Sequence, residues 1–93
     1  MCSLEDVIVQ KAPHSSISDL DKHKFLVPYE VTVAQFIWIL RQRLKLDPRK
    51  AIYLFVNRTL PQSSALMGEI YYQCQEDDGF LYVIFSGENT FGF

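Results

Sequence analysis

Two short apolar runs without polar alternation constrain the fold most, at residues 51–56 (AIYLFV) and 80–85 (FLYVIF). A strand exposed on one face alternates apolar with polar residues, so these runs predict strands that are covered on both faces or nearly so. Turn residues bound them, with Asn57-Arg58-Thr59 after the first and Gly79 before the second. A chain of 93 residues must therefore place both strands in one small sheet with a covering layer.

Two more strands are predicted in the N-terminal third of the chain. Residues 7–11 (VIVQK) are rich in β-branched side chains and end at Ala12-Pro13, whereas residues 24–27 (KFLV) end at Pro28. The polar stretch between them, residues 14–22 (HSSISDLDK), is typical of a turn-rich connection. We therefore expect the two strands to form a hairpin with a long connection.

A helix is predicted to begin after Thr32. Thr32 and Gln35 have the spacing of a capping box, in which the hydroxyl accepts from the Gln35 amide and the Gln35 side chain reaches back. Behind them, an apolar face of about three turns consists of Val33, Phe36, Ile37, Leu40 and Leu44. Basic residues enrich the C-terminal end, as the helix dipole favours, and Asp47-Pro48 is expected to stop the helix.

A second, shorter helix is predicted before the last strand. Ser63 or Ser64 is its expected N-cap. Its apolar side is expected to consist of Leu66, Met67, Ile70, Tyr71 and Cys74, with the Cys74 thiol free and buried.

The predicted order is strand, strand, helix, strand, short helix, strand. It indicates an α+β fold of the ubiquitin-like β-grasp type, with a four-stranded mixed sheet and helices on one face. We expect residues 7–86 to form the single domain, residues 1–6 a short disordered segment, and residues 87–93 a flexible tail.

Enzymatic and metal-binding chemistry have little support in the residues. A cysteine nucleophile needs an activating base, but Cys74 lies on a predicted buried side, and His14 and His23 lie in or beside a polar loop. The cysteines and histidines lack the short recurrent spacings of a metal site. The net charge of −2 gives no bulk attraction to nucleic acid or anionic membrane. Without a signal-peptide pattern or a long apolar run, we expect a soluble intracellular protein.

A recognition surface is the remaining possibility. Residues 22–28 (KHKFLVP) place basic residues beside an apolar strand, and an edge strand there would accept an extended peptide through its backbone groups. The alternative is that Phe25 and Val27 are ordinary core residues and the lysines a solvated edge. Residues 36–40 (FIWIL) are too apolar for one helix face, so Trp38 and Ile39 either border a groove or leave one semi-exposed tryptophan on a wide core face.

Several stretches in combination resemble one family, the ubiquitin-like autophagy modifiers of the GABARAP and microtubule-associated-protein light-chain-three group. They cover residues 7–93 and include VIVQKAP (7–13), KFLVP (24–28), TVAQF (32–36), DGFLY (78–82) and the tail SGENTFG (86–92). The resemblance implies a β-grasp fold and a non-enzymatic role, and we expect neither a cofactor nor a metal. It also implies that a cysteine protease cuts after Gly92, with Thr90 and Phe91 in its channel and Phe93 removed.

Conjugation is the next step that the resemblance implies. E1-like and E2-like enzymes would pass the Gly92 carboxylate to phosphatidylethanolamine of the forming autophagosome. The chain would then be cytoplasmic, and bound to the autophagosome membrane when it carries the lipid. Glycine suits this chemistry because its carbonyl is approached closely in a narrow active site.

The resemblance further implies binding of aromatic-x-x-aliphatic motifs in cargo receptors, at the edge strand 24–27. The expected aromatic pocket consists of Ile8, Lys24, Leu26 and Phe80. The expected aliphatic pocket consists of Phe25, Val27, Pro28, Val31, Phe36, Ile39 and Leu40. Acidic residues flanking the motif would meet Lys22, Lys24 and Arg43.

The sequence departs from the family at its N-terminus. Members usually have two short helices before the first strand, which wall one side of the aromatic pocket, whereas only residues 1–6 precede Val7 here. We therefore expect a more open aromatic pocket and weaker peptide affinity. The alternative functions are a peptide-binding module that is never conjugated and an inactive truncated isoform.

Overall fold

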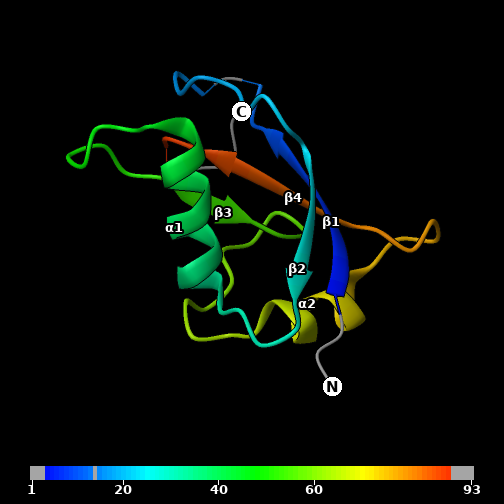
Figure 1. The fold of residues 1–93 in the computed structure, drawn as a ribbon. Helices are drawn as coiled ribbons and strands as arrows, with labels where there is room; N and C mark the ends of the chain where they lie inside the picture. The colour runs from blue at the N-terminus through cyan, green and yellow to red at the C-terminus, as the bar shows by residue number, and fades with distance from the viewer. Residues whose placement is uncertain (1–3, 14, 89–93) are drawn as a thin grey trace.

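The computed structural model describes residues 4–13 and 15–88 (Figure 1). Its elements follow the predicted order: β1 (Leu4–Lys11), β2 (Lys24–Pro28), α1 (Val33–Leu44), β3 (Tyr53–Phe55), α2 (Met67–Cys74) and β4 (Leu81–Ser86). β1 begins at Leu4, three residues before the predicted start, so Leu4 to Asp6 belong to the sheet and not to a disordered N-terminal segment. These residues are paired with β2, in which Pro28 lies opposite Leu4.

The four strands form one mixed sheet in the order β2-β1-β4-β3. β1 and β2 form the predicted antiparallel hairpin, with Val7 opposite Phe25. β1 and β4 are the parallel central pair, with Val7 opposite Leu81, and β3 runs antiparallel to β4. Because a parallel pair needs a long crossover, the chain between β2 and β4 carries both helices and β3. The predicted ubiquitin-like β-grasp arrangement is confirmed.

The capping box of α1 is present as predicted. The Gln35 N–H donates to Thr32 Oγ1 at 3.2 Å, and the Thr32 N–H donates to Gln35 Oε1 at 2.9 Å. The helix ends sooner than the expected stop at Asp47-Pro48, because Lys45 adopts a left-handed conformation (φ 52°). Its N–H donates to the carbonyls of Arg41 and Gln42, which satisfies the last turn.

The predicted serine cap of α2 is wrong. The helix begins at Met67, and the residue before it, Leu66, has its N–H bonded to Glu69 Oε1 at 3.3 Å. The preceding segment is held by α1, since the Ser63 carbonyl accepts from Ala34 N–H at 3.0 Å. The Cys74 thiol, predicted to be buried, is only half-buried at the last position of the helix.

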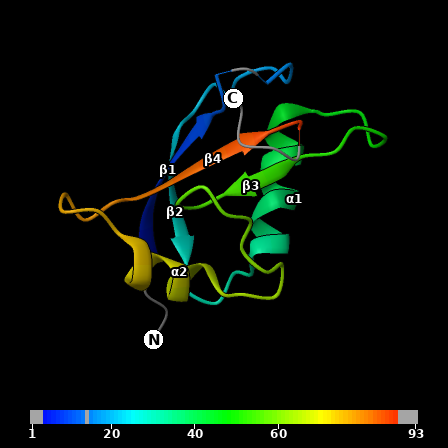
Figure 2. The same ribbon diagram turned by 180° about the vertical axis from the view of Figure 1, so that it is seen from behind.

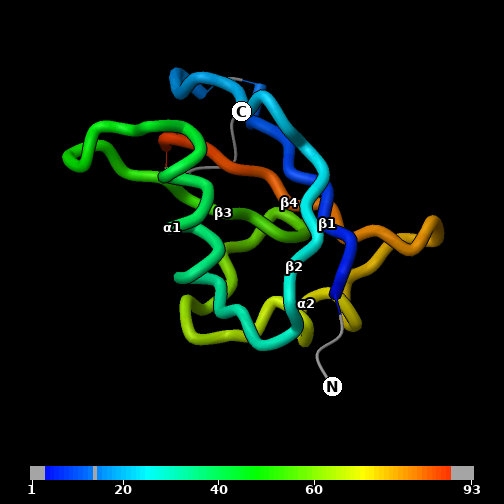
Figure 3. The backbone as a smooth tube through the Cα atoms, in the orientation of Figure 1, coloured from blue at the N-terminus to red at the C-terminus, as the bar shows by residue number. Residues whose placement is uncertain are grey.

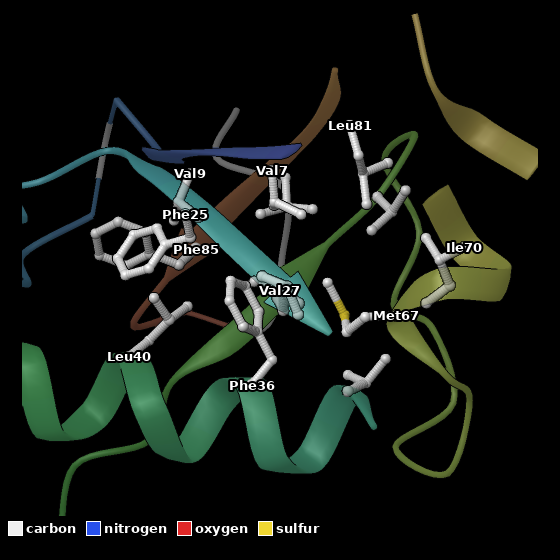
Figure 4. Packing of buried hydrophobic residues seen from close by; sticks show 14 of the residues in the cluster. Val7, Val9, Phe25, Val27, Phe36, Leu40, Met67, Ile70, Leu81 and Phe85 are labelled. Carbon is white, nitrogen blue, oxygen red and sulfur yellow. The ribbon is translucent and has the colours of Figure 1, made fainter. Parts of the chain in front are cut away.

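The core lies between α1 and the sheet (Figure 4). Phe36 and Leu40 point from α1 towards the strands and are fully buried, and Phe36 meets Phe25 edge to face with the ring centroids 5.9 Å apart. Met67 and Ile70 of α2 belong to the same cluster. Figures 1 and 2 show α1 lying across the sheet and α2 near the end of β2.

The second face of the sheet is less covered than the apolar runs predict. In β4, Leu81, Val83 and Phe85 are buried, but Tyr82 and Ile84 are only half-buried. The alternation shows that only the α1 side of β4 faces the core. Two residues of the core were not predicted from the sequence. Ile17 and Leu20 lie in the polar connection between β1 and β2, where they are buried and join the core.

Candidate functional site

β2 is an edge strand of the sheet, and its backbone groups divide between two sides. The Val9 N–H donates to the His23 carbonyl at 2.7 Å, which marks a hydrogen-bonded pair at the start of the hairpin. Because such pairs alternate in antiparallel strands, the backbone groups of Phe25 and Val27 face β1. Those of Lys24 and Leu26 therefore face the open edge, where an added strand would find them.

A groove runs along this edge, between β2 and α1. Its volume is about 410 Å³, and it is lined by Lys22, Lys24, Phe25, Leu26, Val27, Pro28, Phe36, Ile39 and Arg43. The lining is apolar in the middle and basic at one end. An extended chain seated here would contact strand backbone on one side and helix side chains on the other.

Two cations stand over the floor of the groove. The Lys22 ammonium lies 5.4 Å from the centroid of the Phe25 ring, and the Arg43 guanidinium lies 5.8 Å from it. Both distances are in the range of cation–π attraction, which holds the two positive groups at this end. Acidic residues of a ligand would meet them there.

The predicted aromatic-pocket residues lie together, although only Lys24 and Leu26 line the groove itself. Ile8 is paired with Lys24 across the hairpin, and the Lys24 ammonium lies 5.0 Å from the Phe80 ring centroid. Leu26 is 60% exposed, which is unusual for a large apolar side chain in a strand. Strand pairing and the cation–π contact thus connect Ile8, Lys24 and Phe80, and Leu26 follows two residues after Lys24 on the same strand.

Two hydrogen bonds to the Asp78 carboxylate hold the backbone at Phe80. The carboxylate accepts from the Tyr82 hydroxyl at 2.6 Å and from the Phe80 N–H at 2.9 Å. These bonds, the one from Tyr82 foremost, stabilise the charged carboxylate and lower the pKa of Asp78. The same bond raises the pKa of Tyr82, since loss of the hydroxyl proton would break it.

Five of the seven predicted aliphatic-pocket residues line the groove. Pro28 and Ile39 line the groove at its surface, while Phe25, Val27 and Phe36 line it and are also buried in the core. Phe25 and Val27 therefore belong both to the core and to the lining of the groove. Leu40 does not line the groove and is fully buried beneath it, because it points from α1 into the sheet (Figure 4).

Val31 lies outside the groove, in an adjoining pocket that it lines with Gln35, Trp38 and Ile39. Gln35 thus lines this pocket in addition to forming the predicted capping box. The helical pattern alone does not predict that Gln35 lines a pocket, because this pocket depends on where the segment between β2 and α1 runs.

The predicted conjugation residues Gly92 and Phe93, with Thr90 and Phe91, lie outside the described residues. The base of their tail is held by contacts that sequence reasoning missed. The Gly87 N–H donates to the buried Ser15 hydroxyl oxygen at 3.0 Å, and the Glu88 N–H donates to Ser86 Oγ at 3.0 Å. A Cβ on Gly87 would lie 2.8 Å from Ile17, so the glycine permits this close approach.

Residues 4–13 and 15–88 contain neither a membrane-spanning helix nor a cluster of metal-ligating side chains. No helix among them is long and apolar enough to cross a membrane. In residues 4–13 and 15–88, no group of three or more histidine, cysteine or acidic side chains is placed to hold a metal ion.

Comparisons with known proteins agree on one family. The family model described as autophagy protein Atg8, ubiquitin-like, matches residues 5–92. The chain is 56% identical over 86 residues to autophagy-related protein 8B of rice (Oryza sativa subsp. indica), covering 92% of this chain and 72% of the relative. It is 55% identical over 86 residues to autophagy-related protein 8 of Saccharomyces cerevisiae (strain YJM789), covering 92% and 74%.

A solved structure gives the same result for the fold. The crystal structure of Trypanosoma brucei ATG8 superposes with a TM-score of 0.89 at 43% identity, covering 97% of this chain and 78% of that one. The sequence match spans nearly the whole chain, and the four-stranded sheet with two helices is shared. The chain therefore belongs to the Atg8 family of ubiquitin-like autophagy proteins.

Proposed function

We propose that this chain is a ubiquitin-like modifier of autophagy that binds aromatic-x-x-aliphatic peptide motifs at the edge of β2 and is conjugated to phosphatidylethanolamine through Gly92. The observation that carries the binding part is the groove between β2 and α1, which combines outward-facing backbone groups with apolar walls and a basic end. The conjugation part rests on family membership, since the family match extends to residue 92.

The backbone geometry supports an added strand. Lys24 and Leu26 direct their N–H and carbonyl groups to the open edge, and a peptide that pairs with them gains main-chain hydrogen bonds regardless of sequence. Alternate side chains of that peptide point to opposite sides. In an aromatic-x-x-aliphatic motif the two anchors then reach different parts of the surface, one near Leu26 and Phe80 and the other between Val27 and Ile39.

The charge of the groove supports acidic flanks on the peptide. Lys22 and Arg43 stand at one end of the groove over Phe25, in a chain whose net charge is −2. A local positive patch on an overall negative protein attracts acidic peptides and repels basic ones. We therefore place cargo receptors with acidic residues beside the motif among the partners.

Titration of a labelled aromatic-x-x-aliphatic peptide with acidic flanks tests the binding site. Leu26→Asp is expected to weaken binding at least tenfold, because it places a charge in the apolar surface that the aromatic anchor would cover. Leu60→Asp is the matched control, since Leu60 is also exposed (50%, against 60% for Leu26) but lies outside the groove. Equal affinities for wild type and Leu26→Asp would overturn the edge-strand site.

The Lys24 position tests the electrostatic part separately. Lys24→Glu removes the cation over Phe80 and introduces repulsion towards acidic flanks, so binding is expected to fall about tenfold at low salt. The difference from wild type should narrow at high salt, because salt screens both the attraction and the repulsion. Lys50→Glu, an exposed lysine after α1, has the same change in charge and should leave affinity within about twofold.

Conjugation proceeds through the carboxylate of Gly92 once water has cleaved the Gly92–Phe93 peptide bond. A free carboxylate does not form an amide in water, so an E1-like enzyme must activate it with a nucleoside triphosphate and pass it as a thioester to an E2-like enzyme. The lipid amine then displaces the thiol and forms the amide. The resulting anchor places the chain on autophagosome membranes, and the unconjugated chain in the cytoplasm.

Intact-mass measurement tests this chemistry. Incubation with the family's cysteine protease should release Phe93, and protein recovered from cells should carry the mass of the lipid. Gly92→Ala is expected to block both steps, because the added methyl group hinders close approach to the carbonyl. Normal lipid attachment on the Gly92→Ala chain would refute the proposed role of this residue while leaving the peptide site standing.

A further inference from the structure

α1 has a second apolar face that the sheet does not cover. Val33, Phe36 and Leu40 are buried, whereas Trp38 is 61% and Ile39 36% exposed. Gln35, Trp38 and Ile39 are spaced i, i+3 and i+4, so they share one outward face of the helix. With Val31 they line a pocket in which Gln35 stands among the largely apolar side chains of Val31, Trp38 and Ile39.

This pocket, which we call the Trp38 subsite (Val31, Gln35, Trp38 and Ile39), is continuous with the peptide groove. Ile39 lines both. Six large hydrophobic side chains are exposed among the described residues, and three of them, Leu26, Trp38 and Ile39, border the groove or the subsite. Concentration of exposed apolar area on one surface marks a binding site.

The path of the chain decides which occupant reaches the subsite. β2 ends at Pro28, and the segment 29–32 leads directly into α1. The end of β2 and the start of α1 therefore lie at the same end of the molecule (Figure 3). A peptide that pairs with the edge of β2 and extends past Pro28 therefore encounters Val31 first. It then reaches Gln35 and Trp38 on the first two turns of the helix.

We infer that the Trp38 subsite binds a further apolar side chain of the same peptide, beyond the aliphatic anchor; this rests on the peptide-binding function proposed above. The indole offers a large, rigid apolar surface with little conformational entropy to lose. Gln35 adds polar capacity, because its Oε1 accepts from the Thr32 N–H while its NH₂ group is a hydrogen-bond donor. Trp38 thereby selects, among aromatic-x-x-aliphatic peptides, those that carry a third apolar residue.

Trp38 is the only tryptophan of the chain, so its fluorescence reports on the subsite directly. Two tryptophan-free peptides are compared, with Phe as the aromatic anchor. One ends at the aliphatic anchor, and the other continues for six residues that include a leucine. We expect the long peptide to shift Trp38 emission to the blue and to bind about tenfold more tightly, and the short one to bind without the shift.

Variants separate the subsite from the groove. Trp38→Ala should reduce the affinity of the long peptide to that of the short one and leave the short one unchanged, while Trp38→Phe retains part of the difference. Leu60→Ala removes another exposed apolar side chain and should change neither affinity. Circular dichroism confirms that each variant is folded.

The outcomes are distinct. Equal affinities of the two peptides for the wild type, or equal losses of both on Trp38→Ala, would overturn the inference while the proposed groove stands. Binding of neither peptide would overturn the proposed function and the inference with it. A blue shift that depends on protein concentration without peptide would assign the subsite to a second copy of the chain and likewise overturn the inference.

Discussion

Replacement of Gly68 by alanine tests how the end of β2 is fixed to α2. Gly68 is buried, and a Cβ at this position would fall inside van der Waals contact with three carbons of the Tyr29 ring, of which the farthest, Cε2, is 2.6 Å away. The Gly68 N–H also donates to the Tyr29 carbonyl at 3.1 Å. The backbones of Gly68 and Tyr29 therefore cannot move apart without loss of this hydrogen bond. To accommodate the Cβ, the Tyr29 ring must move instead.

The expected change in the free energy of unfolding of Gly68→Ala follows from two opposing effects. Helix propensity favours alanine over glycine by up to about 1 kcal/mol. Overpacking costs about 1–3 kcal/mol, and three ring atoms at such short distances place this case at the upper end. Displacement of the ring also disturbs its contact with Tyr72, whose centroid lies 6.2 Å away. The net expected loss in the free energy of unfolding is about 2 kcal/mol, or about 10 °C in melting temperature for a domain of this size.

A double-mutant cycle monitored by urea denaturation isolates the clash. In a Tyr29→Ala background the same Gly68→Ala substitution should stabilise by up to about 1 kcal/mol, because only the propensity term remains. The coupling between the two positions is then about 3 kcal/mol. Unchanged or increased stability of Gly68→Ala alone would refute the packing argument, and so would equal effects in both backgrounds.

Three further predictions concern the cap, the core and pH. Thr32→Ala removes the acceptor of the Gln35 N–H and should lower the free energy of unfolding by about 1 kcal/mol in urea titrations, with Thr32→Ser close to wild type. Leu40→Ala, at a fully buried position, should cost about 2–5 kcal/mol, and a smaller loss by calorimetry would contradict its place in the core. The pKa of Asp78 is lowered in the native state. Its carboxylate therefore stabilises the fold above the unfolded-state pKa of about 3.9, and this stabilisation is lost as pH falls through the native pKa. Asp78→Asn should therefore lose less stability than wild type between pH 6 and pH 3, as denaturation midpoints at the two pH values would show.

Local patterns predicted most of the secondary structure because local physics determines it. The Thr32–Gln35 pair encodes its own cap, and the apolar spacing behind it encodes the buried face of α1. Errors arose where a distant contact decides the outcome. The serine cap predicted for α2 is wrong, because the Ser63 carbonyl accepts from the Ala34 N–H of α1. The predicted start of β1 is too late, because the first residues of β1 gain their partners only from β2.

The sequence by itself determined the element order, the edge-strand motif and the resemblance to one family. These rest on neighbours within a few residues and on the residues themselves. The tertiary structure alone decided that Phe25 and Val27 serve both core and groove, that Leu40 lies beneath the groove, and that Ile39 joins the groove to the Trp38 subsite. The reason is that exposure and continuity depend on how α1 crosses the sheet, and residues far apart in the chain set that crossing.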